Sequence, residues 1–172
     1  MRRKIITNIV FTIIIIILLY AILKISYKNN YFKKLIGINL PKDSIVLKSE
    51  DTHGGFHGDG ELFIEVQLTD KGSVEFVNNT KNTGKWTSLP LPKDLTAMLY
   101  GGEFNGIIHD ENNMFKAVPK DINKGSYYFR DRFAERYPES KDKSIFDRGS
   151  YNFTGAILDL NTNKLYIYEL DT

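Results

Sequence analysis

The sequence predicts an α+β fold in which a transmembrane helix precedes a small domain built on an antiparallel sheet. Three features indicate this: an apolar run near the N-terminus, several segments in which apolar and polar residues alternate, and a short amphipathic segment that follows a proline. The chain has 172 residues, the size of one domain with a short appendage. Alongside the sheet we expect one or two short helices.

The apolar run is IVFTIIIIILLYAIL, from Ile9 to Leu23. With Ile5 and Ile6 upstream, it approaches the roughly 20 residues that cross the hydrocarbon core of a bilayer. Within lipid a single segment satisfies its own backbone hydrogen bonds only as a helix. We therefore expect a cytoplasmic tail at 1–4, a membrane anchor at 5–24, a polar and aromatic stalk at 25–34 and the folded domain at 35–172.

A cleaved signal peptide is the alternative for this segment, because the basic residues at 2–4 resemble the start of an export signal. Cleavage requires small residues after the apolar run, but Leu23, Lys24 and Ile25 occupy those positions. The chain also has no cysteine, which excludes lipid modification of an N-terminal cysteine. An uncleaved anchor is therefore favoured.

Charge is divided unevenly along the chain. Residues 1–34 hold seven of the 23 basic residues and no acidic residue, which leaves 16 basic and 21 acidic residues, a net charge of −5, for 35–172. An acidic domain lacks the basic footprint of a nucleic-acid-binding protein. Basic residues flank both ends of the apolar run, but a short tail carrying Arg2, Arg3 and Lys4 favours a cytoplasmic N-terminus and a domain outside the cell.

The first half of the domain contains two expected strands and an expected hairpin. Ser44–Leu47 is the first expected strand, and ELFIEVQL at 61–68 has the two-residue period of the second. DKG at 70–72 predicts a turn into a further strand, SVEFV, and so a β-hairpin. Pro92 predicts the start of a short helix that Gly101 ends.

The second half contains three further strand regions. Residues 104–118 predict one or two short strands around DENN, a tetrad typical of turns. GSYYFRDRF at 125–133 predicts a strand that runs into a long polar loop at 134–150. YNFTGAILDL and KLYIYEL predict two strands joined by a hairpin turn at NTN, residues 161–163.

The stretch DTHGGFHGDGE at 51–61 has the composition closest to that of a functional site. Its candidate binding residues are Asp51, His53, Gly54, Gly55, His57, Gly58, Asp59 and Gly60. The spacing is not that of a helical HExxH zinc motif or of an EF-hand, and the glycines precede a strand where a nucleotide-binding loop would precede a helix. A tight turn stabilised by its own polar side chains, a metal or anion site, and a partner-binding loop all remain open.

Two other segments have a chemical and a structural interpretation. His109 precedes Asp110 and Glu111 and could join His53, His57 and Asp59 as a ligand of a divalent metal, but a solvated strand end is the favoured explanation, because DENN has ordinary turn composition. YYFRDRF interleaves aromatic residues with arginines, as many binding sites do. A strand with one core face and one polar face explains the same pattern. No catalytic nucleophile motif is present, and no cofactor is expected outside the metal alternative.

Five segments, LIGINLPKDS, DTHGGFHGDGE, SLPLPKDL, YYFRDRF and NTNKLYIYELDT, resemble those of a family of small, uncharacterised, membrane-anchored proteins of Firmicute-type bacteria. The resemblance covers most of 35–172, and its most specific part is the glycine-rich segment. It implies an N-terminal anchor and an extracytoplasmic α+β domain, and it implies no reaction.

Together these features predict a single-pass protein of the cell membrane with an extracellular domain for binding, sensing or association with the envelope. Its expected partners are the membrane, through residues 5–24, and an envelope protein. One alternative is a metal-dependent hydrolase that uses the loop of His53 and His57. A second is an immunity or inhibitor protein.

Overall fold

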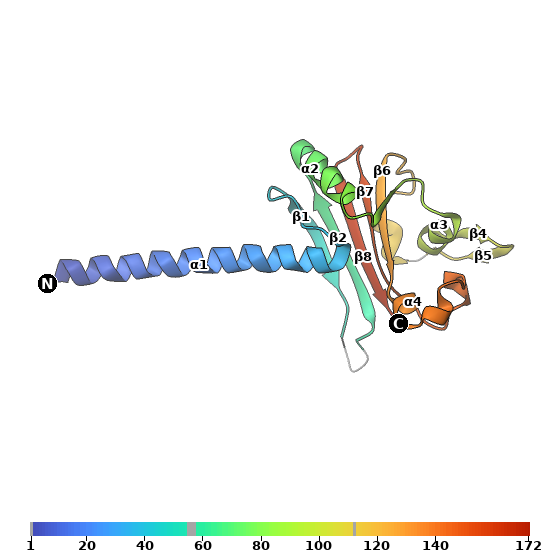
Figure 1. Cartoon of the computed structure of the whole chain (residues 1–172), viewed down its shortest axis with the longest axis horizontal. Helices are drawn as coiled ribbons and strands as arrows, with labels where there is room; N and C mark the ends of the chain where they lie inside the picture. Colours follow the sequence, from blue (N-terminus) through green and yellow to red (C-terminus); the bar gives the residue numbers. More distant parts are fainter. Residues whose placement is uncertain (1, 55–57, 112) are drawn as a thin grey trace. The chain divides into compact units, whose positions relative to one another are not determined.

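The computed structural model describes the backbone of residues 2–54, 58–111 and 113–172, and it describes side chains within these ranges except at 2–9, 21–29, 113 and 114. The chain divides into two compact units, Met1–Leu40 and Pro41–Thr172. Figure 1 shows the elements of both units.

The first unit contains one long helix, α1, at Arg2–Ile36. At a rise of about 1.5 Å per residue, its 35 residues span about 52 Å. Ten large apolar side chains between Val10 and Tyr20 are 41–66% exposed. In the part of the chain that the structure describes, no helix meets both the length and the apolar character required of a membrane span.

The second unit is built on a six-stranded sheet with the order β1-β2-β8-β7-β6-β3, and all its neighbouring strands are antiparallel. The strands are β1 (Ile45–Asp51), β2 (Gly60–Gln67), β3 (Trp86–Ser88), β6 (Gly125–Asp131), β7 (Asn152–Asp159) and β8 (Lys164–Asp171). A separate hairpin consists of β4 (Gly102–Phe104) and β5 (Ile107–His109). The antiparallel α+β prediction is confirmed.

The helices of this unit are α2 (Asp70–Lys81), α3 (Lys93–Tyr100) and α4 (Arg132–Arg136), with 3-10 turns at Asn113–Ala117, Pro138–Ser140 and Ile145–Asp147. Figure 1 shows α3 beside the β4–β5 hairpin, and α4 near the C-terminal end of β8. The sequence therefore predicted the principal strands and α3, but it underestimated the helical content.

One buried cluster joins one face of the sheet to α3 and to the 3-10 turns. Its sheet residues alternate along the strands, as Tyr166, Tyr168 and Leu170 do on β8. The remaining members are Phe63, Leu95, Met98, Leu99, Phe115, Val118, Ile145, Phe153 and Ile157. Gly155 lies opposite Tyr168 in the β7–β8 pair, and a Cβ at this position would come within 2.1 Å of the tyrosine ring. The large ring therefore requires a glycine on the neighbouring strand.

The expected hairpin at 70–77 is wrong, because these residues form α2. The Thr69 hydroxyl accepts a hydrogen bond from the Gly72 amide at 2.9 Å and caps the helix. Phe76 and Thr80 are buried at helical spacing. A local cap and a helical apolar face therefore override the turn character of Asp-Lys-Gly.

The strands predicted around DENN are also placed differently. The β4–β5 hairpin turns at Asn105 and Gly106, which both have positive φ angles of 53° and 80°. An Asn-Gly pair favours such a tight turn. Within DENN, Asp110 and Glu111 follow β5, Asn112 lies outside the described residues and Asn113 begins a 3-10 turn. The polar loop predicted at 134–150 contains short helical segments.

Candidate functional site

The stretch 51–61 begins at the last residue of β1 and ends at the second residue of β2, the strand with which β1 pairs, and its residues 51–54 and 58–61 are described. The Thr52 amide donates to the Glu61 carbonyl at 2.9 Å, and the Glu61 amide donates to the Thr52 hydroxyl at 2.9 Å. Further out, the Gly54 amide donates to the Asp59 carbonyl at 3.4 Å. Gly55 and His57 lie outside the described residues. The described part of the stretch is therefore a turn held by its own hydrogen bonds.

Two glycines of this turn have identifiable backbone roles. A Cβ on Gly60 would lie 2.4 Å from the His53 Cα and 2.5 Å from its backbone nitrogen. The backbone at Gly60 and the backbone at His53 therefore approach each other more closely than a side chain on residue 60 would permit. Gly58 has a φ of 73°, which an L-residue with a side chain rarely adopts. The glycine-rich composition is explained at these two positions by geometry.

His53 lies between two carboxylates. Its Nδ1 is 2.7 Å from Asp51 Oδ1, and its Nε2 is 3.3 Å from Asp171 Oδ2. The His53 amide also donates to Asp51 at 3.0 Å. The hydrogen bond from the histidine ring, followed by that from its backbone amide, lowers the pKa of Asp51. His53 is therefore hydrogen-bonded to Asp51 within the turn and lies beside the last residue of β8, with its Nε2 buried and without a hydrogen-bond partner among the described residues.

Arg132 completes this cluster from the first position of α4. It forms ion pairs with Glu169 at 3.2 Å and with Asp171 at 2.9 Å, and it donates to the carbonyls of Phe153 and Leu170 at 3.1 and 3.3 Å. The sequence had placed Arg132 on the polar face of a strand. The structure instead uses it to neutralise the acidic end of β8.

One group of side chains in the described residues has the geometry of a metal site, namely His53, Glu169 and Asp171, whose potential ligand atoms lie within 4.8 Å of one another. This group differs from the predicted set, because Asp59 and His109 are not members and His57 is not described. The guanidinium of Arg132 already neutralises two of the three potential ligands. A metal ion at this position would therefore compete with an arginine.

Asp59 and Gly58 line a neighbouring groove of about 610 Å³ together with Arg132, Arg136 and Asp171. His109 lies in a different setting, at the end of β5, where its ring stacks on Phe146 with centroids 3.7 Å apart. This aromatic contact gives His109 a structural role. The predicted residues Asp59 and His109 thus lie in different places, Asp59 in the groove with Arg132 and His109 against Phe146.

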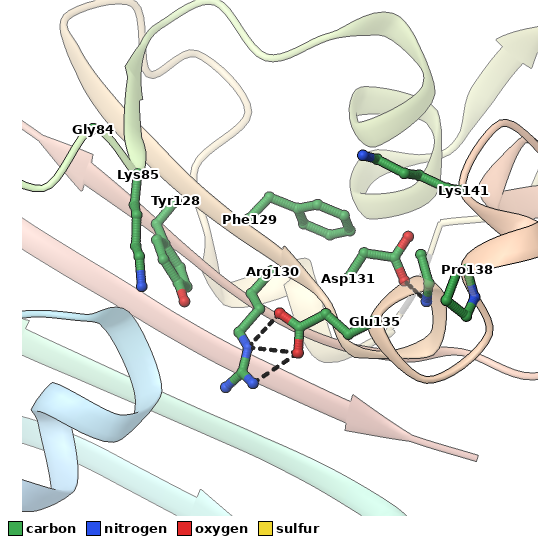
Figure 2. Close-up of a pocket in the computed structure, with 10 residues that line it drawn as sticks. Gly84, Lys85, Tyr128, Phe129, Arg130, Asp131, Glu135, Pro138 and Lys141 are labelled. Atoms are coloured by element: carbon green, nitrogen blue, oxygen red, sulfur yellow. Dashed lines mark hydrogen bonds and ion pairs between the residues drawn. The ribbon is translucent and has the colours of Figure 1, made fainter.

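A second pocket, of about 720 Å³, lies beside β6 and is lined mainly from β6 and α4 (Figure 2). β3 pairs only with Ser126–Tyr128, so the pocket occupies the side of β6 beyond the end of β3. The lining residues are Gly84, Lys85, Tyr128, Phe129, Arg130, Asp131, Ala134, Glu135, Pro138 and Lys141. Its volume lies within the range of small-molecule sites.

Two acidic residues of the pocket are engaged in ion pairs. Arg130 donates from Nε and Nη2 to the Glu135 carboxylate at 2.7–3.1 Å, the fork-like arrangement that Figure 2 shows. This hydrogen bonding lowers the pKa of Glu135 and raises that of Arg130. Asp131 accepts from Arg148 and from the Ala134 amide, and so caps α4.

The sequence indicated part of this pocket. YYFRDRF contributes Tyr128, Phe129 and Arg130 to the lining, and its mixture of aromatic and basic residues was the available signal. Lys85 and Lys141 were not identified, because they come from segments distant in sequence that only the fold brings together. Comparisons with protein-family models, with curated proteins and with solved structures give no match to this chain.

Proposed function

We propose that this chain is a single-pass membrane protein whose acidic α+β domain lies outside the cell and binds a ligand or an envelope partner. The observation that carries the proposal is the apolar surface of α1. From Val10 to Tyr20, large apolar side chains occupy every position except Thr12 and are exposed. A helix that is apolar on all sides is typical of a buried or membrane-spanning element.

The sequence around α1 supports the same placement. The apolar run continues to Leu23, and the flanking segments contain basic and no acidic residues. The basic cluster at 2–4 favours retention of the N-terminus in the cytoplasm, which directs Pro41–Thr172 to the outer side. The absence of cysteine is compatible with an exported domain that has no disulfides.

The binding role is supported by the pocket beside β6. Three of its charged groups, Arg130, Asp131 and Glu135, are oriented by ion pairs and by a helix cap, so this part of its polar surface is arranged before any ligand arrives. Aromatic and aliphatic residues supply the rest of the lining. This combination of an apolar wall with a few oriented polar groups is characteristic of ligand sites.

Extraction of membranes with alkaline carbonate tests the anchor. We expect the full-length chain to remain in the membrane pellet, whereas a variant with Ile15→Lys and Leu18→Lys is released, because each charge in the bilayer centre costs about 2.5–3.5 kcal/mol. The matched control, Ile15→Leu with Leu18→Ile, should remain in the pellet. Recovery of the unmodified chain in the carbonate supernatant would contradict the proposal.

A metal-dependent hydrolase is the second candidate, and the group His53, Glu169 and Asp171 is the observation that favours it. If it is correct, calorimetric titration of the full chain with Zn²⁺ should give saturable binding that His53→Ala abolishes. His109→Ala should leave that binding intact, because His109 stacks on Phe146 away from this group. An absence of Zn²⁺ binding excludes this candidate and leaves the binding role unaffected.

A further inference from the structure

The pocket beside β6 carries an excess of positive charge on an acidic domain. Asp131 is paired with Arg148, and Glu135 with Arg130. Lys85 and Lys141, which also line the pocket, form no ion pair with any described residue. Figure 2 shows both lysine side chains extended, with Lys85 directed along Tyr128. Neither lysine is held in an ion pair, although Lys85 also attracts the Glu135 carboxylate, and together the two cations favour an anionic ligand over a cationic one.

Tyr128 adds an unused hydrogen-bond donor to this lining. The residue is only 3% exposed and its ring packs against Trp86, with centroids 5.7 Å apart. Its hydroxyl is not among the buried polar atoms that lack a partner, and it forms no hydrogen bond with a described residue, so it remains available to a ligand at the pocket. Burial raises the pKa of Tyr128, and its hydroxyl, like that of any tyrosine, is protonated and can donate at neutral pH.

Arg130 has a donor available on the same strand face as Tyr128, because alternate residues of a strand point to the same side. Its Nε and Nη2 donate to Glu135, and its Nη1 has no partner within the described part of the chain. The ion pair with Glu135 fixes the orientation of the guanidinium. A ligand oxygen can therefore be bound without the entropic cost of ordering a free arginine.

We propose that this pocket binds an oxyanion carried on an aromatic or apolar group. Lys85, the Tyr128 hydroxyl and Arg130 Nη1 hold the oxyanion on one face of β6. Phe129 lies on the opposite face, so the rest of the ligand reaches Phe129, Ala134 and Pro138 past the edge of β6 that β3 leaves open. Lys141 adds long-range attraction from the other side of the strand. The inference names the ligand class of the proposed binding domain, and it does not depend on the membrane anchor.

Trp86 is the only tryptophan of the chain, so its fluorescence reports on the surroundings of Tyr128. We would titrate the full-length chain, in mild detergent at pH 7.5, with phenyl phosphate and separately with benzoate. Inorganic phosphate provides the anion without the ring, and phenol provides the ring without the anion. We expect saturable binding of at least one aromatic oxyanion, weaker binding of inorganic phosphate and no binding of phenol.

Three variants locate the site. Lys85→Met and Tyr128→Phe each remove one donor and retain the bulk of the side chain, and each should weaken binding about tenfold, as expected for a hydrogen bond to a charged group. Lys93→Met, at an exposed lysine of α3 outside the pocket, is the matched control and should bind as the unmodified chain does. Circular dichroism confirms that each variant is folded.

Several results would overturn the proposal. These are no binding of either aromatic oxyanion, unchanged affinity in both Lys85→Met and Tyr128→Phe, or binding of phenol as tight as that of phenyl phosphate. If inorganic phosphate binds as tightly as the aromatic oxyanions, the apolar part of the ligand contributes no affinity, which contradicts the proposed ligand class. None of these results bears on carbonate extraction, so failure of the ligand assignment and failure of the anchor are distinguishable.

Discussion

Gly60 is the residue on which the geometry of the β1–β2 turn depends most directly. Its Cα faces the backbone of His53 across the hairpin, and no flexible side chain could move aside to make room for a Cβ. The same close approach positions the His53 ring between Asp51 and Asp171. A small backbone feature therefore determines the contact between the turn and the end of β8.

Gly60→Ala should lower the free energy of unfolding by about 2 kcal/mol or more, because the added Cβ overlaps fixed backbone atoms. Gly149→Ala is the control, since a Cβ there meets nothing within 4 Å, and it should change stability by less than about 0.5 kcal/mol. Urea denaturation followed by Trp86 fluorescence measures both values. Equal stability of the two variants would contradict the tight approach.

Arg132 neutralises the carboxylates of Glu169 and Asp171 at the same end of the sheet. Its replacement by methionine leaves Glu169 and Asp171 without their cation, and it removes two hydrogen bonds to backbone carbonyls. We expect a loss of about 2–4 kcal/mol in the free energy of unfolding at pH 7. Arg136→Met, at an exposed arginine of the same helix, should cost less than about 0.5 kcal/mol, and a similar loss in both variants would argue against this role.

At the scale of the element, α2 shows how one side chain determines the local structure. Thr69 supplies the N-cap, and its hydroxyl also donates to Asp43, so it ties the start of the helix to the preceding segment. The segment that follows it contains Val74, Phe76 and Val77, which suit a strand as well as a helix. The cap and the buried side of Phe76 decide in favour of the helix.

Thr69→Ala should therefore destabilise the protein by about 1–2 kcal/mol, the usual effect of losing an N-cap. Thr69→Ser keeps the capping hydroxyl and should retain most of the stability. The free energy of unfolding and the helical signal in circular dichroism report the difference. An alanine variant as stable as the serine variant would show that the cap is not required.

The elements that could be predicted from sequence are those with strong local patterns. β2, β6, β7 and β8 follow from alternation and turn residues, and α3 follows from Pro92 and Gly101. The sites could not be predicted in the same way, because their contacts join distant segments. Arg132 and Asp171 are 39 residues apart, and the pocket beside β6 draws on β6, α4 and the isolated residues Lys85 and Lys141.

At the scale of the whole molecule, several tyrosines of the sheet and of α3 are buried or partly buried, and burial disfavours the ionised form of their phenols. Burial is the main cause that raises the pKa values of Tyr100, Tyr128, Tyr166 and Tyr168, and for Tyr100 the value is about 12. A phenol that ionises more readily in the unfolded chain stabilises the fold fully below the unfolded pKa of about 10. That contribution is lost as the pH rises through the folded value.

The free energy of unfolding should accordingly fall between about pH 10 and about pH 12. Tyr100→Phe should make this fall shallower, since it removes one of the phenols that ionises preferentially in the unfolded state. Tyr137→Phe, at a tyrosine that is 39% exposed, serves as the control. Identical pH dependence of the Tyr100→Phe variant and the unmodified chain would show that burial of Tyr100 does not contribute.

The two units of the chain suit different environments, and this is the basis of the proposed function. Residues 10–20 of α1 expose apolar side chains, while Pro41–Thr172 forms an acidic domain with a core of its own. A membrane-embedded helix carrying an external domain accommodates both surfaces. Ligand binding by the domain would then take place outside the cell, where the pocket beside β6 meets the surrounding medium.

Protease accessibility in intact spheroplasts tests this account most directly, with an epitope at the C-terminus and an antibody against a cytoplasmic protein as the control for integrity. The account predicts that protease added from outside removes the epitope while the cytoplasmic protein remains intact, and that the chain sediments with the membrane. A C-terminal domain that is degraded only after the spheroplasts are lysed, or a chain recovered without the membrane, would contradict it.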